Sequence, residues 1–227
     1  MRRPPRLFAL LAVVTGCSTG TGGGGFFPTD GGGGGEAADL RPAAPVYPPG
    51  PYGNKIDDTL ADITFKGYRL DVENTDSGSL GFEDDIKLAE YLTGAGVAPK
   101  ASRKCKCLLI TWGAGWCSAC KQEQPALKMD IDGDPDFCVL NILQEGNAQG
   151  PLATKSDLDA WTQRYQQNFY VVLGSSYTKN LWKGHARNGV ISLPFNFVVD
   201  AKTMKILDVV QGYRKDIHTY SMGLCGH

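Results

Sequence analysis

The chain has 227 residues, of which 42% are hydrophobic and 21% charged, and its formal net charge is −1. This length gives room for one ordinary domain and some extra chain, and the composition excludes a wholly disordered protein or a polytopic membrane protein. A near-neutral balance supplies no basic surface, so we expect no nucleic-acid partner. Seven cysteines are many for a cytosolic protein, and they require an oxidising compartment, a metal or a thiol enzyme.

The N-terminus has the pattern of an export signal. Three arginines among residues 2–6 precede an apolar run over 7–14, which is too short to span a bilayer. Residues 14–17 (VTGC) resemble the lipobox of bacterial lipoproteins, in which the cysteine becomes the lipidated first residue. We expect residues 1–16 to be a signal peptide and Cys17 to carry the lipid; an ordinary secretory signal with an incidental cysteine is the alternative. Ser18 resembles the outer-membrane sorting pattern of Gram-negative lipoproteins, so we expect a protein anchored on the periplasmic side.

Residues 17–50 are expected to be a disordered tether. Glycine runs at 22–25 and 31–35 are typical of flexible coil, and the prolines that follow stiffen the chain. A Gly-x-Gly-x-x-Gly pattern at 20–25 has no strand before it and no helix after it, so it predicts no dinucleotide site. The folded domain is therefore expected over 51–227.

From residue 51 the chain alternates apolar strand-like segments with amphipathic ones. Residues 63–65 and 68–72 predict a hairpin, and residues 83–93 predict a short helix. The later expected elements are strands at 107–111, 137–143, 169–173, 195–200 and 205–211, and helices at 117–129, 156–166 and 177–187. This order predicts an α/β fold with a mixed sheet and helices on both faces. Ser156 and Asp159 suit a capping arrangement for the helix over 156–166.

The sharpest local signal is residues 116–121 (WCSACK), where a buried strand turns into a helix. Cys117, at the helix N-terminus, faces unpaired backbone N–H groups and the positive end of the helix dipole. Both favour the thiolate, which is the nucleophile of disulfide chemistry. Cys120, one turn along, can attack a mixed disulfide on Cys117 and release the partner. We therefore expect a redox pair; a structural disulfide and half of a zinc site are the alternatives.

Residues 112–121 resemble the active-site segment of thioredoxin, and Pro125 matches that family's helix-kinking proline. Residues 120–125 (CKQEQP) are closer still to the TlpA/ResA-type subgroup, which has C-x-x-C-[KR]-x-E-x-P. Those proteins are membrane-tethered extracytoplasmic thiol–disulfide oxidoreductases. The resemblance, over roughly 55–212, implies a thioredoxin-like fold with an N-terminal β-hairpin extension and an extra helix at 156–166 before the cis-proline strand. It also implies that Cys117 attacks and that Cys120 resolves.

Residues 192–200 (SLPFNFVVD) match the cis-proline strand of the same family. In that fold the proline packs against the CxxC motif, and the backbone before it pairs with substrate. The resemblance thus assigns Trp116, Leu193 and Pro194 to substrate binding. An X-Pro bond that enters a buried strand is also a candidate for a cis bond by itself, because proline cannot donate to the ladder there.

Departures from the family pattern concern proton transfer. Thr111 stands where the family has a buried acid that accepts a proton, which leaves the deprotonation of Cys120 unassigned. Glu123 is a candidate for a proton relay, and water is the alternative.

Two other departures concern the redox potential and the C-terminus. The dipeptide between the cysteines lacks the common Gly-Pro, so the redox potential is not implied by the resemblance. The tail after Gln211 is short for the last thioredoxin helix.

Four cysteines remain beside Cys17 and the CxxC pair, an even number as secreted proteins prefer. Cys107 and Cys138 begin two strands that should be parallel neighbours, at the sheet end opposite the CxxC motif. We expect a structural disulfide from Cys105 or Cys107 to Cys138 or Cys225, with the connectivity open.

The three histidines, His185, His218 and His227, are expected on the surface. A tail metal site at Cys225 and His227 is an alternative for that pair of residues. Otherwise the sequence predicts no metal site and no cofactor.

The sequence thus predicts an exported, lipid-anchored thiol–disulfide oxidoreductase. Its partners would be protein thiols or disulfides and an unidentified redox donor or acceptor, with the direction open. A peroxiredoxin-like peroxidase is an alternative, but Ile110 and Ala114 occupy the positions where that chemistry requires Pro and Thr. A thioredoxin-fold copper chaperone, with His185 as a ligand, would use a wider cysteine pair. A non-catalytic scaffold is the last alternative, since fold does not imply function.

Overall fold

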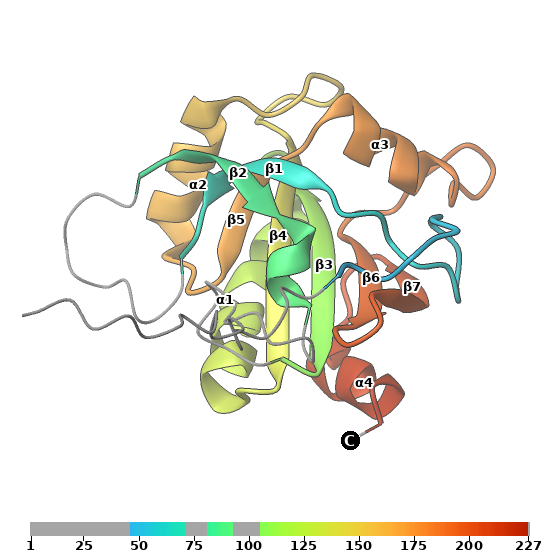
Figure 1. The fold of residues 1–227 in the computed structure, drawn as a ribbon. Helices are drawn as coiled ribbons and strands as arrows, with labels where there is room; N and C mark the ends of the chain where they lie inside the picture. The colour runs from blue at the N-terminus through green and yellow to red at the C-terminus, as the bar shows by residue number, and fades with distance from the viewer. Residues whose placement is uncertain (1–45, 71–80, 93–104, 227) are drawn as a thin grey trace, which may run out of the picture. The chain divides into compact units, whose positions relative to one another are not determined.

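The computed structural model describes residues 46–70, 81–92 and 105–226. Seven strands form one sheet in the order β2-β1-β5-β4-β3-β6-β7 (Figure 1). Within these residues no helix is both long and apolar enough to cross a membrane. The expected signal peptide, Cys17 and the glycine runs of the tether lie outside the described residues, so they stay predictions.

Three parallel strands form the centre of the sheet. They are β3 (Cys107–Ala114), β4 (Phe137–Glu145) and β5 (Tyr170–Leu173). β6 (Phe195–Asp200) runs antiparallel to β3, and β7 (Lys205–Gln211) runs antiparallel to β6. Every residue of β3 and β4 is buried, as expected for parallel strands with both faces covered. The predicted mixed sheet is confirmed.

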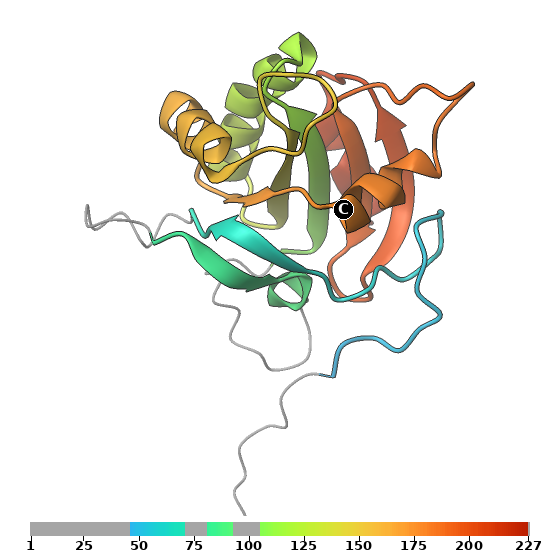
Figure 2. The same cartoon turned by 90° about the horizontal axis from the view of Figure 1, so that it is seen from above.

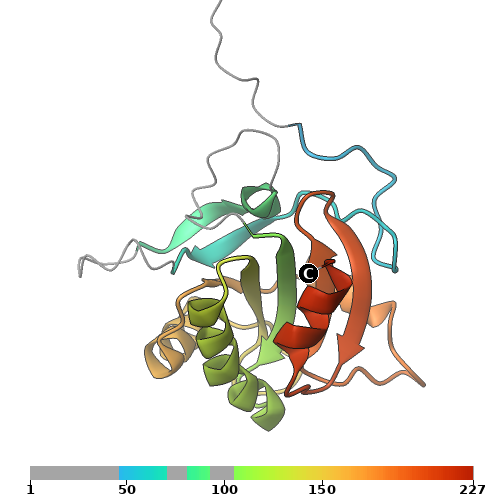
Figure 3. The same ribbon diagram turned by 90° about the horizontal axis from the view of Figure 1, so that it is seen from below.

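Helices cover both faces of the sheet (Figures 2 and 3). α1 (Ser118–Gly133), α2 (Lys155–Tyr165) and α4 (Ile217–Leu224) share one apolar core with the side chains that point to their face of the sheet. α3 (Ser176–Lys183) shares the core on the opposite face, where its Trp182 is buried. The α4 helix exists although the tail after β7 is short.

The N-terminal hairpin exists, but its second strand was predicted wrongly. β1 (Thr64–Tyr68) pairs with β2 (Glu83–Lys87), which lies in the segment expected to be helical. Only one turn of 3-10 helix follows, η2 (Leu88–Tyr91). Ile86 and Leu88 are two residues apart and both buried, so the segment follows strand periodicity at this point. Of the strand expected at 68–72, residues 71 and 72 lie outside the described part of the chain.

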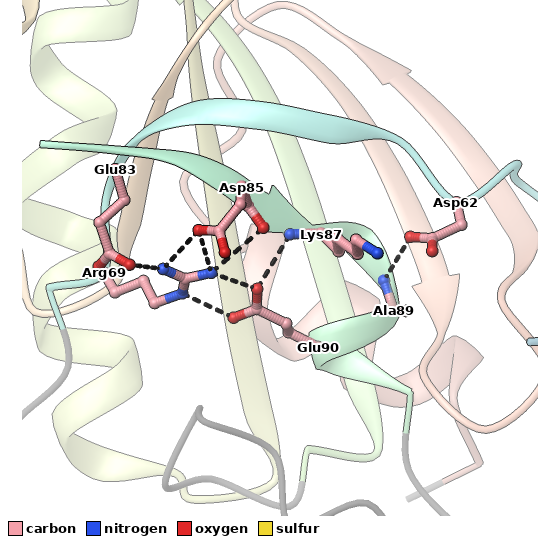
Figure 4. A network of polar contacts seen from close by, with 7 residues as sticks. All are labelled: Asp62, Arg69, Glu83, Asp85, Lys87, Ala89 and Glu90. Atoms are coloured by element: carbon pink, nitrogen blue, oxygen red, sulfur yellow. Dashed lines mark hydrogen bonds and ion pairs between the residues drawn. The ribbon is translucent and has the colours of Figure 1, made fainter. Parts of the chain in front are cut away.

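Arg69, the residue after β1, is buried in a cluster of carboxylates. Its side chain is only 6% exposed, and it forms ion pairs with three carboxylates, those of Glu83, Asp85 and Glu90 (Figure 4). Its Nε and Nη2 donate to the two oxygens of Glu90 at 2.9 and 2.6 Å. Burial alone would raise the pKa of Glu90, but Arg69 and the hydrogen bond from the Lys87 backbone N–H together outweigh it and lower that pKa. The cluster fastens η2 to the end of β1.

The start of α2 lies two residues before the expected cap. Thr154 is the N-cap, and its hydroxyl accepts a hydrogen bond from the backbone N–H of Asp157. The Asp157 carboxylate accepts in return from the Thr154 backbone N–H at 2.9 Å, which completes a capping box. Asp159 instead forms an ion pair with Lys155 at 2.8 Å. The helix itself is confirmed.

Two disulfides close the sheet end opposite the CxxC motif. Cys105 bonds Cys138 and Cys107 bonds Cys225, with Cα–Cα distances of 5.6 and 5.7 Å. In the β3–β4 register Cys107 lies opposite Phe137, so Cys107 and Cys138 point to opposite faces of the sheet. Each therefore bonds a partner on its own face, which settles the open connectivity. Because Cys225 is in a disulfide, the alternative of a metal site at the tail is wrong.

Removing these disulfides tests their separate contributions. They close loops of 118 residues for Cys107–Cys225 and 33 residues for Cys105–Cys138. In the chain-entropy account the longer loop contributes about 1 kcal/mol more, within a total of roughly 3–5 kcal/mol each. We expect the double alanine variant of Cys107 and Cys225 to lose more unfolding free energy in urea than that of Cys105 and Cys138. The reverse order would show that local packing, not loop closure, dominates.

Candidate active site

The CxxC motif lies at the junction of β3 and α1. Cys117 is the N-cap of α1, and its Sγ accepts a hydrogen bond from the Cys120 backbone N–H at 3.0 Å. The two sulfurs form a disulfide, so the structure shows the oxidised state. After reduction, the same N–H group and the dipole of a long helix stabilise a thiolate on Cys117. Cys117 is 5% exposed and Cys120 is fully buried, so Cys117 is the sulfur that a partner can reach.

Trp116 stands beside the motif and is 38% exposed. Its indole Nε1 donates to Glu145 at 3.0 Å, and Lys179 forms an ion pair with the other oxygen of that carboxylate at 2.8 Å. Burial alone would raise the pKa of Glu145, but the bonds from Lys179, the Gly150 N–H and Trp116 outweigh it and lower that pKa. An ionised Glu145 thus fixes the orientation of the exposed ring.

Leu193 and Pro194 lie at the entry to β6, and the peptide bond between them is cis, as expected. Trp116 and Leu193 line one groove of about 360 Å³. The rest of its lining comes from α3, the loop after it, the end of β4 and the loop after β4: Glu145, Gln149, Lys179, Trp182, Lys183, Gly189, Val190 and Ile191. The structure therefore brings two of the expected substrate-binding residues, from distant parts of the sequence, to one surface hollow.

Glu123 is buried beneath the motif, with 1% of its surface exposed. It follows Cys120 by three residues on α1, so the two lie on one face of the helix. A Cβ added to Gly113 would contact the Cys120 Sγ at 3.8 Å, which places Cys120 over Gly113. Two residues earlier on β3, the Thr111 hydroxyl donates to Glu123 at 2.8 Å. The proton-relay candidate therefore lies about one helix turn beyond the buried cysteine, on the same sheet-facing side of α1.

The environment of Glu123 raises its pKa from 4.5 to about 7. Burial is the largest cause, because it disfavours the charged carboxylate; the hydrogen bonds from Thr111 and Asn196 act in the opposite direction. A carboxyl group with such a pKa gains and loses a proton near neutral pH, as a general acid or base must.

Two buried asparagines of this site were missed by the sequence analysis. Asn196 on β6 donates to Glu123 at 3.5 Å, and Asn141 on β4 donates to the Thr111 carbonyl at 3.4 Å. The available signal was an amide side chain within an otherwise apolar segment of each strand. A polar residue in a fully buried strand needs a partner, although only the sheet register shows which one.

His185 and His218 are less exposed than expected. His185 packs against Phe195 and Phe197, and its Nε2 lies 2.6 Å from the Asn54 carbonyl oxygen. His218 is half-buried and forms a hydrogen bond with Asp134 at 3.0 Å. His227 lies outside the described residues. Across the described part of the chain, no group of three or more His, Cys, Asp or Glu side chains is arranged to hold a metal ion.

Comparison with solved structures identifies the architecture. A structure from Chlorobium tepidum, described as a thiol:disulfide interchange protein DsbE, matches with a TM-score of 0.50 and 18% identity. The match covers 76% of this chain and 99% of that one. This chain has a thioredoxin-like fold. The expected thioredoxin-like fold is thus confirmed. It contains an N-terminal hairpin, whose second strand is β2, and the helix α2 before the cis-proline strand.

Other solved structures give weaker matches. A thioredoxin-family thiol:disulfide interchange protein from Chlorobium tepidum TLS has a TM-score of 0.49 and 19% identity, over 83% of this chain and 100% of that one. The exposed lipoprotein thioredoxin Etrx1 of Streptococcus pneumoniae has a TM-score of 0.47 and 20% identity, over 72% and 98%. No family model matches the sequence, and no curated protein matches it.

The raised pKa of Glu123 predicts a dependence of stability on pH. Between pH 4.5 and about 7 the native carboxyl holds a proton that the unfolded chain has lost. The contribution of Glu123 to the free energy of unfolding is therefore most favourable below pH 4.5, and it falls by about 3 kcal/mol as the pH rises to 7. We expect Glu123→Gln to remove this fall, as measured by urea unfolding of the oxidised protein. Parallel pH profiles for the variant and the wild type would contradict the assignment.

Proposed function

We propose that this protein is an exported, lipid-anchored thiol–disulfide oxidoreductase that exchanges disulfides with extracytoplasmic proteins through Cys117 and Cys120. One observation carries the proposal: the accessible sulfur caps a helix N-terminus, while the second is buried one turn along, above a carboxyl that titrates near neutral pH. A merely structural disulfide would need neither the capping N–H nor the buried acid. The thioredoxin-like fold agrees with this chemistry but does not establish it.

The reaction in the reducing direction follows from this geometry. The Cys117 thiolate attacks a client disulfide, forming a mixed disulfide and expelling one client thiolate, which takes a proton from water. Cys120 transfers its proton to the Glu123 carboxylate, and the resulting thiolate attacks Cys117. That step forms the Cys117–Cys120 disulfide and releases the second client thiolate. Two electrons have then passed to the client, and a protein dithiol must return two electrons to the pair.

The groove beside Trp116 supports a polypeptide client. Val190 is 65% exposed on its wall, and Leu193 precedes the cis-proline at its end. Lys183 is exposed on the same wall and forms an ion pair with no carboxylate of the described residues. An extended client segment could therefore place an apolar side chain against Val190 while its cysteine approaches Cys117.

The remaining cysteines support an oxidising compartment. Both pairs far from the motif are bonded, and disulfides of this kind persist outside the cytoplasm. Together with the export pattern at 1–16 and the lipobox-like residues 14–17, they favour a domain tethered through Cys17 on the periplasmic side of a membrane. Ser18 favours the outer membrane.

A redox titration with thiol trapping tests the redox pair. We expect Cys117 and Cys120 to titrate as one reversible two-electron pair, while the two other disulfides stay oxidised over the same range. A potential below roughly −230 mV would indicate a reductant, and one near roughly −120 mV an oxidant. If the CxxC pair forms no reversible disulfide, the proposed function is wrong.

Single cysteine variants test the order of the two thiols. We expect Cys120→Ser to accumulate mixed disulfides with client proteins, because nothing resolves the bond at Cys117. Cys117→Ser should lose exchange activity and trap no client, since Cys120 is buried. The double alanine variant of Cys105 and Cys138 is the matched control and should retain exchange. Trapping through Cys120 in the Cys117→Ser variant would reverse the assigned roles.

The lipid anchor has its own test. We expect the wild-type protein to fractionate with membranes and to incorporate labelled fatty acid, and Cys17→Ala to lose the label. Ser18→Ala, which keeps the cysteine, is the control for the altered sequence. A Cys17→Ala protein that still incorporates the label would show that the chain is lipidated elsewhere.

A further inference from the structure

A row of polar side chains crosses the centre of the otherwise apolar sheet. In register, Thr111 on β3 lies opposite Asn141 on β4 and opposite Asn196 on β6. All three are fully buried, on the face that α1 covers. Their neighbours in the same line, Val171 on β5 and Val210 on β7, are apolar. The row is thus confined to the three strands beneath the CxxC helix.

Two members of the row contact Glu123. The Thr111 hydroxyl donates to one carboxylate oxygen at 2.8 Å, and the Asn196 amide reaches the other at 3.5 Å. The carbonyl oxygen of the Asn196 side chain is buried and has no hydrogen-bond partner among the described residues. A buried acceptor is costly without a donor, which a water molecule or another protonation state of the site can supply.

The chemistry of these two groups fits both forms of Glu123. A hydroxyl can donate one hydrogen bond or accept two, and an amide has a donor and an acceptor end. When Glu123 is ionised, Thr111 and the Asn196 NH2 group donate to it. When Glu123 is protonated, its own O–H can donate to the Asn196 carbonyl after the amide turns, or to the Thr111 oxygen.

We propose that Thr111 and Asn196 are positioning residues that hold Glu123 in place in both protonation states, so that it can take the Cys120 proton and later return it. This inference rests on the proposed function. In one direction the proton moves from the Cys120 thiol to the carboxylate as the thiolate attacks the mixed disulfide. In the other, an incoming dithiol breaks the Cys117–Cys120 bond, and the departing Cys120 thiolate takes the proton back from Glu123.

No other titrating group competes for this role in the described residues. Thr111 from β3, Asn196 from β6 and Asn141 from β4 do not titrate, and Cys120 is the titratable neighbour on the same helix. Only burial and the two hydrogen bonds shift the pKa of Glu123, with no contribution from a neighbouring charge. Removing either bond should therefore act directly on the proton affinity of Glu123.

The test measures the Glu123 carboxyl itself. In the oxidised protein, carbon-13 NMR of labelled glutamate carboxyls follows the titration of Glu123. The Glu123 signal is assigned as the one that is missing from the spectrum of the Glu123→Gln variant. We expect Thr111→Val to raise the midpoint by about one pH unit, because a hydrogen bond to the carboxylate is stronger than one to the neutral acid. Thr111→Ser keeps the hydroxyl and should restore the midpoint. Asn196→Leu should shift it in the same direction by less, since its bond is longer.

A kinetic measurement links the midpoint to the reaction. A small thiol is first joined to Cys117 as a mixed disulfide, and its release by Cys120 is followed against pH. We expect the release by Thr111→Val to be about tenfold slower than that of the wild type at pH 6, and the difference to vanish at high pH. The matched control is Asn141→Leu, in the same row but not bonded to Glu123, which should lower stability and leave the midpoint unchanged.

The outcomes separate this inference from the function on which it rests. If Thr111→Val leaves both the Glu123 midpoint and the pH profile of release unchanged, the inference is overturned while disulfide exchange stands. If Asn141→Leu shifts the midpoint as much as Thr111→Val, the shift results from nonspecific disruption of packing and not from loss of the hydrogen bond to Glu123. The inference is then overturned too. A wild-type protein that never exchanges disulfides through Cys117 would overturn the proposed function, and the inference with it.

Discussion

The packing of α1 on β3 determines most of what this site can do. Because β3, α1 and β4 form a parallel crossover unit, α1 runs back along the strand that precedes it. One turn forward on the helix therefore corresponds to two residues backward on β3. Cys120 lies over Gly113 and Glu123 over Thr111 as a result. The buried cysteine and the buried acid are neighbours because a helix turn and a strand repeat are similar in length.

The placement of the acid has an energetic consequence. A carboxyl carried by the helix is enclosed between α1 and the sheet, where no cation of the described residues compensates its charge. Its burial is costly in the ionised form, and only Thr111 and Asn196 offset part of that cost. The buried carboxylate therefore lowers the stability of the protein at neutral pH, and the same carboxylate provides a proton acceptor near Cys120. The position on β3 where the family that the sequence resembles has a buried acid is Thr111 here, and its hydroxyl donates to Glu123 on α1.

The other disulfides and the Arg69 cluster maintain the frame around this site. β3 is held at its start by bonds on both faces, to β4 through Cys138 and to α4 through Cys225, while its end carries the reactive pair. The two kinds of disulfide are separated by the length of the strand. At the far edge of the sheet, the buried Arg69 ties the hairpin and η2 together. Reaction at Cys117 can thus proceed without opening the bonds that hold the sheet.

The sequence by itself determined the reactive motif, the central strands and the helices around them. These features are local: a CxxC pair after an apolar strand, a proline at the entry to another, and the difference between strand and helix periodicity. It also indicated Glu123 as a proton-relay candidate for Cys120, because Thr111 stands where the family that the sequence resembles has a buried acid. The helix prediction for residues 83–93 was wrong because a run this short fits both strand and helix periodicity. Only its pairing with β1 decides between the two.

Only the tertiary structure decided the contacts between distant segments. The partner of each structural cysteine follows from which sheet face it occupies, and that depends on the β3–β4 register. The polar row beneath α1 likewise exists only because residues 111, 141 and 196 fall in line across three strands. Burial of Glu123 among them then sets its pKa. Register and burial are properties of the assembled sheet, which is why no single segment of the sequence contains them.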